Sequence, residues 1–178
     1  MKIVDFSFFA DIDPRDSFYA NWSRQYEYPW VISRLRAYGA KSVHNTACGG
    51  SQQIHGKFAI ALGGEFKTTN SDVFVDSSWF VRDYCDITIP RRGEKFDAVV
   101  CVSAIEHING HAPIEIIKNL LGHVNDGGIV LITLDSPPVN IAQLANELKC
   151  GCRVPENILT CSQEPYVGTN VVRLEIIK

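Results

Sequence analysis

The chain has 178 residues, of which 46% are hydrophobic and 21% are charged, and its formal net charge is -3. This length and composition are typical of one globular domain with one core, so we expect residues 1–178 to form a single domain. The small negative charge does not favour binding to the phosphate backbone of a nucleic acid, so no nucleic-acid partner is expected.

The amino terminus and the cysteines predict a cellular location. The first ten residues carry one basic side chain, Lys2, and Asp5 interrupts their apolar run, which is not the pattern of a secretory signal. No apolar run approaches the roughly 20 residues needed to cross a bilayer. A chain of this length can build a core without disulfides, so its six cysteines are expected to be reduced thiols. We therefore expect a soluble, cytoplasmic protein with no membrane partner.

Residues 1–40 are rich in aromatic side chains and are expected to form a helical segment. A short helix is predicted to begin at Asp13-Pro14 and a second at Pro29, because proline is favoured at the first position of a helix. Gly39 is expected to end the second helix.

Strands and helices are predicted to alternate through the rest of the chain. The run at 98–102 is too short for a buried helix and suits a parallel strand buried on both faces. The predicted elements are a strand over 42–46, a helix over 54–62, strands over 66–71, within 79–87 and over 98–102, a helix over 112–121, a strand over 129–133, a helix over 141–148 and a terminal strand within 167–177. This alternation predicts an α/β fold with a doubly wound sheet.

The stretch from Phe96 to His107, read Phe-Asp-Ala-Val-Val-Cys-Val-Ser-Ala-Ile-Glu-His, resembles the fourth strand of class I methyltransferases and the residues that follow it. Polar groups come after this strand at its carboxyl end, where open α/β sheets bind ligands. The resemblance covers roughly residues 28–137. It implies a mostly parallel, Rossmann-like sheet with helices on both faces and an antiparallel carboxyl-terminal strand, and S-adenosylmethionine as the cofactor.

Residues 43–51 are similar to the segment of that family written Val-Leu-Asp-Ile-Gly-Cys-Gly-Thr-Gly. The Cys-Gly step is kept, but Ala47 and Ser51 replace two glycines, and Asn45 replaces the aspartate. A simple turn between a strand and a helix is the alternative interpretation. The resemblance implies that five residues contact the methionine part of the cofactor from beneath: Asn45, Ala47, Cys48, Gly49 and Gly50.

Acidic residues near the ends of the next predicted strands are the candidates for binding the adenosine part of the cofactor. In the family, an acid at the end of the second strand accepts hydrogen bonds from the two ribose hydroxyls, and both oxygens of one carboxylate can do so. Asp72 is the candidate here, and Asp76 is an alternative that the sequence leaves open. Asp86-Ile87 resembles the next family element, in which the acid contacts the adenine amino group and the apolar side chain packs on the ring.

Tyr28 and Trp30 are candidates for a lid over the cofactor, because small-molecule methyltransferases often carry such a lid near the amino terminus. Aromatic rings exclude water and attract a sulfonium through cation-π interaction, worth roughly 0.5 to 2 kcal/mol. Core packing is the competing interpretation for these side chains.

Glu106-His107 follows the fourth strand of the resemblance, where the acceptor is expected. His107 is the candidate general base and Glu106 the candidate group that orients it. A purely structural role in the loop is the competing interpretation. Ser103 is assigned to the cofactor site, although some related quinone-pathway enzymes have glutamate there within a metal-binding Glu-x-x-Glu-His. Since that glutamate is missing and the cysteines at 150, 152 and 161 lack a regular zinc spacing, no metal is expected.

These features predict an S-adenosylmethionine-dependent methyltransferase acting on a small-molecule or saccharide-like acceptor, with O-methylation slightly preferred over N-methylation. The altered glycine turn motivates an alternative, a non-catalytic module that keeps the fold for binding or assembly. A nicotinamide-dependent oxidoreductase fits less well, because Gly-x-Gly-x-x-Gly is absent near the first turn.

Overall fold

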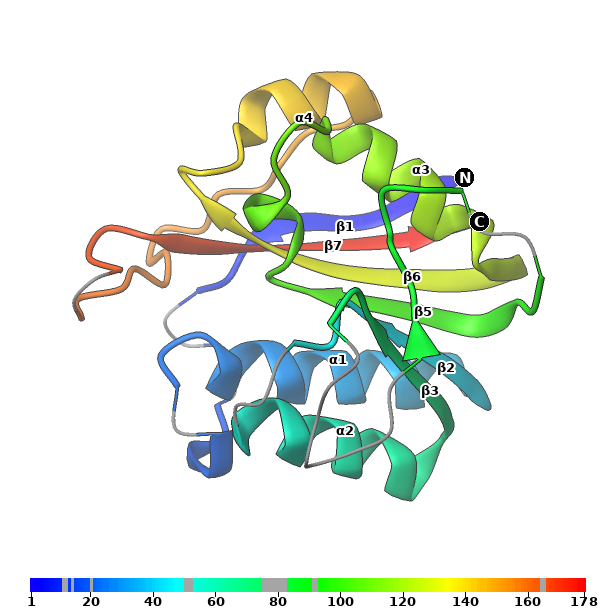
Figure 1. The fold of residues 1–178 in the computed structure, drawn as a ribbon. Helices are drawn as coiled ribbons and strands as arrows, with labels where there is room; N and C mark the ends of the chain where they lie inside the picture. Colours follow the sequence, from blue (N-terminus) through cyan, green and yellow to red (C-terminus); the bar gives the residue numbers. More distant parts are fainter. Residues whose placement is uncertain are drawn as a thin grey trace.

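The structure is a computed structural model that describes residues 1–10, 13, 15–19, 21–49, 53–74, 83–90, 93–163 and 166–178. Within these residues the strands form one seven-stranded sheet in the order β1-β7-β6-β5-β2-β3-β4. Helices α1 and α2 cover one face, and α3 and α4 cover the other (Figure 1). The strands are β1 (Lys2–Phe8), β2 (Ser42–Thr46), β3 (Lys67–Asp72), β4 (Asp83–Tyr84), β5 (Phe96–Val102), β6 (Val124–Ser136) and β7 (Asn170–Ile177), and the helices are α1 (Arg24–Tyr38), α2 (Gln53–Glu65), α3 (Pro113–Gly122) and α4 (Ile141–Leu148), with single 3-10 turns η1 (Ser17–Tyr19) and η2 (Ile105–His107).

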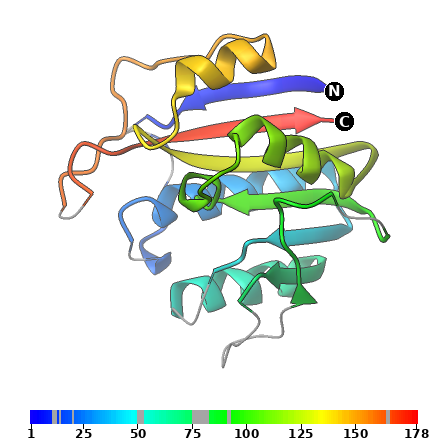
Figure 2. The ribbon, with the colours of Figure 1, turned by 45° about the horizontal axis from the view of Figure 1, so that its top comes forward.

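The sheet is mostly parallel, as the family resemblance implies. Strands β2 to β6 pair in parallel, whereas β7 runs antiparallel to both β6 and β1. The strand order reverses between β2 and β5, and this switch point is where ligands bind in open α/β sheets. The two chain ends lie side by side at the edge that β1 and β7 form (Figure 2).

Strand β5 is buried on both faces, which confirms the interpretation of its short apolar run. Ala98 and Val100 belong to the core cluster under α1 and α2. Val99 and Cys101 belong to the cluster under α3 and α4. Each fully buried aliphatic side chain contributes roughly 1.5 to 3 kcal/mol, so this alternation ties both helical layers to one central strand.

Helix α1 begins at Arg24, so the predicted helix start at Pro29 is wrong. Pro29 lies inside the helix, where it has no N–H to donate to the carbonyl of Gln25. That carbonyl instead accepts a hydrogen bond from the Asp16 N–H at 2.8 Å, which compensates for the missing bond. Gly39 ends the helix as predicted, with a φ of 64° that a residue without a Cβ adopts at low cost.

The amino-terminal segment 1–40 is not entirely helical. It begins with β1, which adds an antiparallel edge strand beside β7. Two other boundaries differ from the prediction, because α2 continues through Gly63 and Gly64 and β6 begins at Val124 rather than after the glycine turn. No helix in the described ranges is both long and apolar enough to span a bilayer.

Candidate functional site

A cavity of about 550 Å³ opens at the carboxyl ends of β2, β3 and β5. Most of the residues predicted to hold a cofactor line it, although they come from five separate segments of the chain. The predicted residues in its wall are Tyr28, Asn45, Ala47, Cys48, Gly49, Asp72, Asp86, Ile87, Ser103 and His107. Gly50 and the alternative acid Asp76 lie outside the described residues.

The turn after β2 has the backbone shape that the sequence suggested. Ala47 and Gly49 both have positive φ, 45° and 84°. A Cβ on Gly49 would lie 2.8 Å from the imidazole ring of His55, closer than real side chains approach. Gly49 is therefore required both for its backbone angle and for the close approach of α2.

Asp72 joins the end of β3 to the turn after β2. Its carboxylate accepts hydrogen bonds from the Gly49 N–H at 2.9 Å and from the Phe74 N–H at 3.0 Å. A carboxylate has about four lone-pair positions, so these two bonds leave capacity for a ligand in the cavity. Asn45 is held in a similar way, since its amide donates to the Asn70 side-chain oxygen at 2.9 Å.

Asp86 and Ile87 form a small ledge after β4. Asp86 Oδ1 accepts hydrogen bonds from the Thr88 hydroxyl at 2.7 Å and the Thr88 N–H at 2.9 Å. These bonds hold the pKa of Asp86 below its ordinary value, so the group is anionic. Ile87 is buried, and its carbonyl accepts a hydrogen bond from Asn119 at 3.2 Å. The ledge thus offers a fixed acceptor beside an apolar surface.

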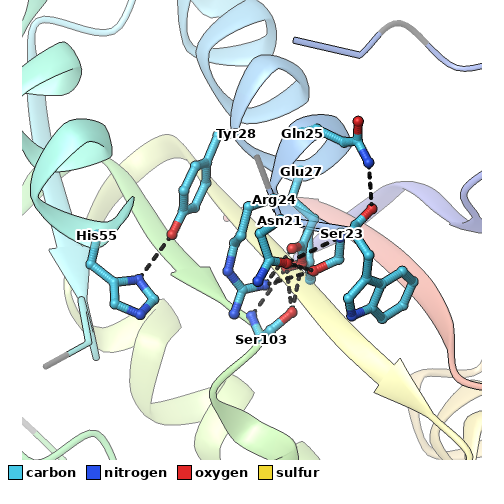
Figure 3. Close-up of polar contacts among 10 residues, drawn as sticks. Asn21, Ser23, Arg24, Gln25, Glu27, Tyr28, His55 and Ser103 are labelled. Carbon is cyan, nitrogen blue, oxygen red and sulfur yellow. Dashed lines mark hydrogen bonds and ion pairs between the residues drawn. The ribbon is translucent and has the colours of Figure 1, made fainter. Parts of the chain in front are cut away.

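Of the two aromatic lid candidates, only Tyr28 lines the cavity. Tyr28 lines the cavity, stacks on Phe58 with 3.9 Å between ring centroids, and its hydroxyl lies 3.0 Å from His55 Nδ1 (Figure 3). Trp30 is not part of the cavity wall. It is half-buried and packs edge-on against Phe9 at 5.8 Å between ring centroids, beside two core clusters.

A buried polar network that the sequence did not indicate supports the cavity wall (Figure 3). Arg24 forms an ion pair with Glu27, and Glu27 Oε1 accepts hydrogen bonds from the hydroxyls of Ser103, at 2.6 Å, and Thr133. Ser103 has a φ of 40°, a left-handed backbone that serine adopts at a cost. The network therefore fixes the turn that follows β5.

The network also keeps Glu27 charged in the core. Burial raises the pKa of Glu27, but the Arg24 guanidinium and the two hydroxyl donors outweigh burial and bring the pKa below its ordinary value. Arg24 itself lines the cavity and is a cation that a bound anionic group would meet there. In the sequence, Arg24 and Glu27 look like an ordinary pair on a helix surface, so only the packing reveals their role.

Glu106 and His107 do not form the pair that the sequence suggested. His107 lines the cavity and is exposed. Both carboxylate oxygens of Glu106 are buried and have no hydrogen-bond partner among the described residues, His107 included. Burial and the nearby charge of Asp135 raise the pKa of Glu106 to about 8, and burial and Glu27 raise that of Asp135 to about 7. The structure therefore does not show Glu106 orienting His107.

Comparison with solved structures identifies the fold. The N-methyltransferase NodS from Bradyrhizobium japonicum WM9 is similar with a TM-score of 0.58 at 14% identity, covering 88% of this chain and 97% of NodS. TehB from Haemophilus influenzae has a TM-score of 0.59 at 16% identity, covering 93% of this chain and 67% of TehB. The 1,6-didemethyltoxoflavin-N1-methyltransferase from Burkholderia thailandensis has a TM-score of 0.56 at 15% identity, covering 86% and 79%.

No protein-family model and no curated protein sequence matches the chain. At these identities the structural likeness establishes the fold alone. The fold is that of the class I S-adenosylmethionine-dependent methyltransferases, as the sequence resemblance implied.

Proposed function

We propose that this protein is an S-adenosylmethionine-dependent methyltransferase acting on a small-molecule or saccharide-like acceptor in the cytoplasm. The observation that carries the proposal is the convergence of Gly49, Asp72 and Ile87 on one cavity at the switch point of the sheet. Two of the similar structures support it: NodS has been crystallised with S-adenosylhomocysteine, and the toxoflavin enzyme with that product and its acceptor.

The chemistry of the cavity wall fits the cofactor. The turn at Gly49 is a close backbone approach with no Cβ, which suits the methionine part, and Arg24 suits its carboxylate. Asp72 has free acceptor capacity for the ribose hydroxyls. Asp86 and Ile87 match the polar edge and the apolar face of adenine.

When bound, the cofactor supplies a methyl group on a sulfonium, an electrophile strong enough that no nucleophilic side chain is needed. The protein's part is to align the acceptor with the methyl group and to exclude water. His107, on the exposed part of the cavity wall, is the proposed base that takes the acceptor's proton as the new bond forms.

Calorimetry with S-adenosylmethionine and S-adenosylhomocysteine, followed by a panel of acceptors, tests the proposal. The panel needs amines as well as hydroxyl compounds, because NodS and the toxoflavin enzyme are N-methyltransferases, whereas the sequence slightly favoured oxygen. Binding of both compounds with methyl transfer to one class of acceptor is the expected result. If neither compound binds the folded protein, the proposal is wrong.

The altered turn favours one alternative, a non-catalytic binding or assembly module. Ala47 stands where the family has glycine and adopts a φ of 45°, which is unfavourable for a residue with a Cβ. Absence of binding of both compounds to the folded protein would favour this alternative over the enzyme.

A further inference from the structure

Three metal-ligating side chains meet in the core beside the cavity, although they come from separate parts of the chain. His44 lies on β2, Cys85 directly follows β4, and His123 follows the last residue of α3. All three are buried. One ligand atom from each lies within 4.8 Å of the other two. The sequence suggested no metal site here, because the three residues share no regular spacing.

The two imidazoles have the separation that a shared ion requires. Their Nδ1 atoms are 3.3 Å apart. Two nitrogens bound to one tetrahedral Zn²⁺, each at about 2.0 to 2.1 Å, lie roughly 3.3 to 3.4 Å from each other. The pair is therefore already at the right spacing, whether it is joined by a hydrogen bond or by an ion.

His44 also has a hydrogen-bond partner on the ring nitrogen that faces away from His123. Its Nε2 lies 2.7 Å from the Ser71 hydroxyl. A hydrogen bond from Nε2–H to that hydroxyl places the ring proton on Nε2 and leaves the Nδ1 lone pair facing His123. With Ser71 as the acceptor, the ring is in the tautomer that binds a metal through Nδ1.

The donor set selects the class of ion. Two imidazole nitrogens and one sulfur are ligands of Zn²⁺ and of copper, whereas Mg²⁺ and Ca²⁺ prefer oxygen ligands, and none of the three side chains offers oxygen. Cys85 also lines the cavity, so the third ligand lies beside a path from solvent.

We propose that His44, Cys85 and His123 bind one Zn²⁺ ion through two Nδ1 atoms and one thiolate, with the fourth position open toward the cavity. Binding releases the thiol proton, and each imidazole carries its remaining ring proton on Nε2. Cys85 directly precedes Asp86 and Ile87, so an ion at this site would link these two cavity residues to β2 and to the end of α3. The proposal does not depend on the proposed methyltransferase activity.

Co²⁺ is a suitable probe, because it takes tetrahedral sites like those of Zn²⁺ and its absorption reports the geometry. The full chain, stripped with a chelator, is expected to bind one Co²⁺ per chain with the intense visible bands of a tetrahedral site and a sulfur charge-transfer band. Zn²⁺ should displace the Co²⁺. Cys85→Ser should remove the charge-transfer band and weaken binding at least tenfold, while the matched control Cys161→Ser, another buried thiol, should bind like the wild type.

X-ray absorption of the Zn²⁺-loaded wild type tests the site without relying on the folding of a variant. One sulfur at about 2.3 Å with nitrogen neighbours supports the site. Two or more sulfurs per ion would place the metal elsewhere, such as at Cys150 and Cys152, and overturn the proposal. Failure of the stripped wild type to bind either ion, or unchanged Co²⁺ bands in a folded Cys85→Ser variant, would overturn it as well.

Discussion

Gly49 is the residue on which the proposed cofactor site depends most directly. Its positive φ and the His55 imidazole, which would lie 2.8 Å from a Cβ, both disfavour a side chain at this position, and its N–H donates to Asp72. Gly64 is a matched contrast, because a Cβ there would meet open space and its φ is ordinary.

Gly49→Ala should therefore weaken binding of S-adenosylhomocysteine at least tenfold, which corresponds to about 1.4 kcal/mol. The strained turn and the displaced His55 ring are the physical reasons. Gly64→Ala should bind like the wild type. Calorimetry on the two folded variants makes the comparison, and equal affinities would remove Gly49 from the site.

Asp72→Asn tests the carboxylate that links two turns. An amide has one acceptor oxygen, so the variant must give up either the bond to Gly49 or the bond to Phe74, and it loses charge toward the ribose. The affinity for S-adenosylhomocysteine should fall about tenfold or more. The control is Asp97→Asn, because Asp97 also accepts two backbone N–H bonds but at the opposite end of β2. A loss of affinity in both variants would indicate a general effect on the fold.

His107→Ala tests the proposed base. A general base contributes roughly 10² to 10⁴-fold to the rate, so kcat should fall by about that factor while the cofactor affinity stays unchanged. His111→Ala is the control, because His111 is exposed in the same loop and is not part of the cavity wall. Turnover of the His107 variant at the wild-type rate over the whole pH range would exclude the role.

Strand β1 shows how an element without a strong local pattern is stabilised by packing. Val4, at the irregular position in the pairing of β1 with β7, is exposed, whereas Phe6 is buried and packs into the core cluster under α3 and α4. Its pairing partner β7 is at the other end of the chain.

Phe6→Ala should lower the free energy of unfolding by about 3 to 5 kcal/mol, the usual cost of removing a buried phenylalanine. Val4→Ala on the same strand should change it by no more than about 0.5 kcal/mol, because Val4 is 41% exposed. Urea denaturation measures both. Similar losses in the two variants would mean that Phe6 is not the main contact of β1 with the core.

The molecule as a whole carries two carboxyl groups that folding makes difficult to ionise. The pKa of Glu106 is raised to about 8 and that of Asp135 to about 7, chiefly by burial. In the pH range between the unfolded and folded pKa values, the folded state binds more protons than the unfolded state. Stability should therefore be greatest near pH 5 and fall as the pH rises to about 8. Glu27, whose pKa is lowered, acts in the opposite direction only at more acidic pH.

Glu106→Gln should flatten this decline, because an amide stays neutral throughout the range. Melting temperatures measured from pH 5 to 8 should fall less in the variant than in the wild type. Glu156→Gln, at an exposed position, should keep the wild-type slope. A Glu106 variant with an undiminished slope would mean that Glu106 is not the source of the pH dependence.

Local patterns alone were enough to predict β2 at residues 42–46, α4 through Ile141 and Leu148, the glycine that ends α1, and the doubly wound class of the fold. These features depend on side-chain periodicity and backbone angles within a few neighbouring residues, which the sequence displays directly. The turn around Gly49, Asp72 at the end of β3 and Asp86 after β4 were instead predicted from the family resemblance.

Only the tertiary structure decided which distant residues meet. It brought Arg24 and Glu27 against Ser103, placed Trp30 on Phe9 rather than over the cavity, added β1 beside β7, and gathered His44, Cys85 and His123 in the core. Contacts of this kind depend on how helices and strands far apart in the chain pack against one another. Packing pairs buried charges and fills volume without regard to sequence separation, so no local pattern in the chain predicts these contacts.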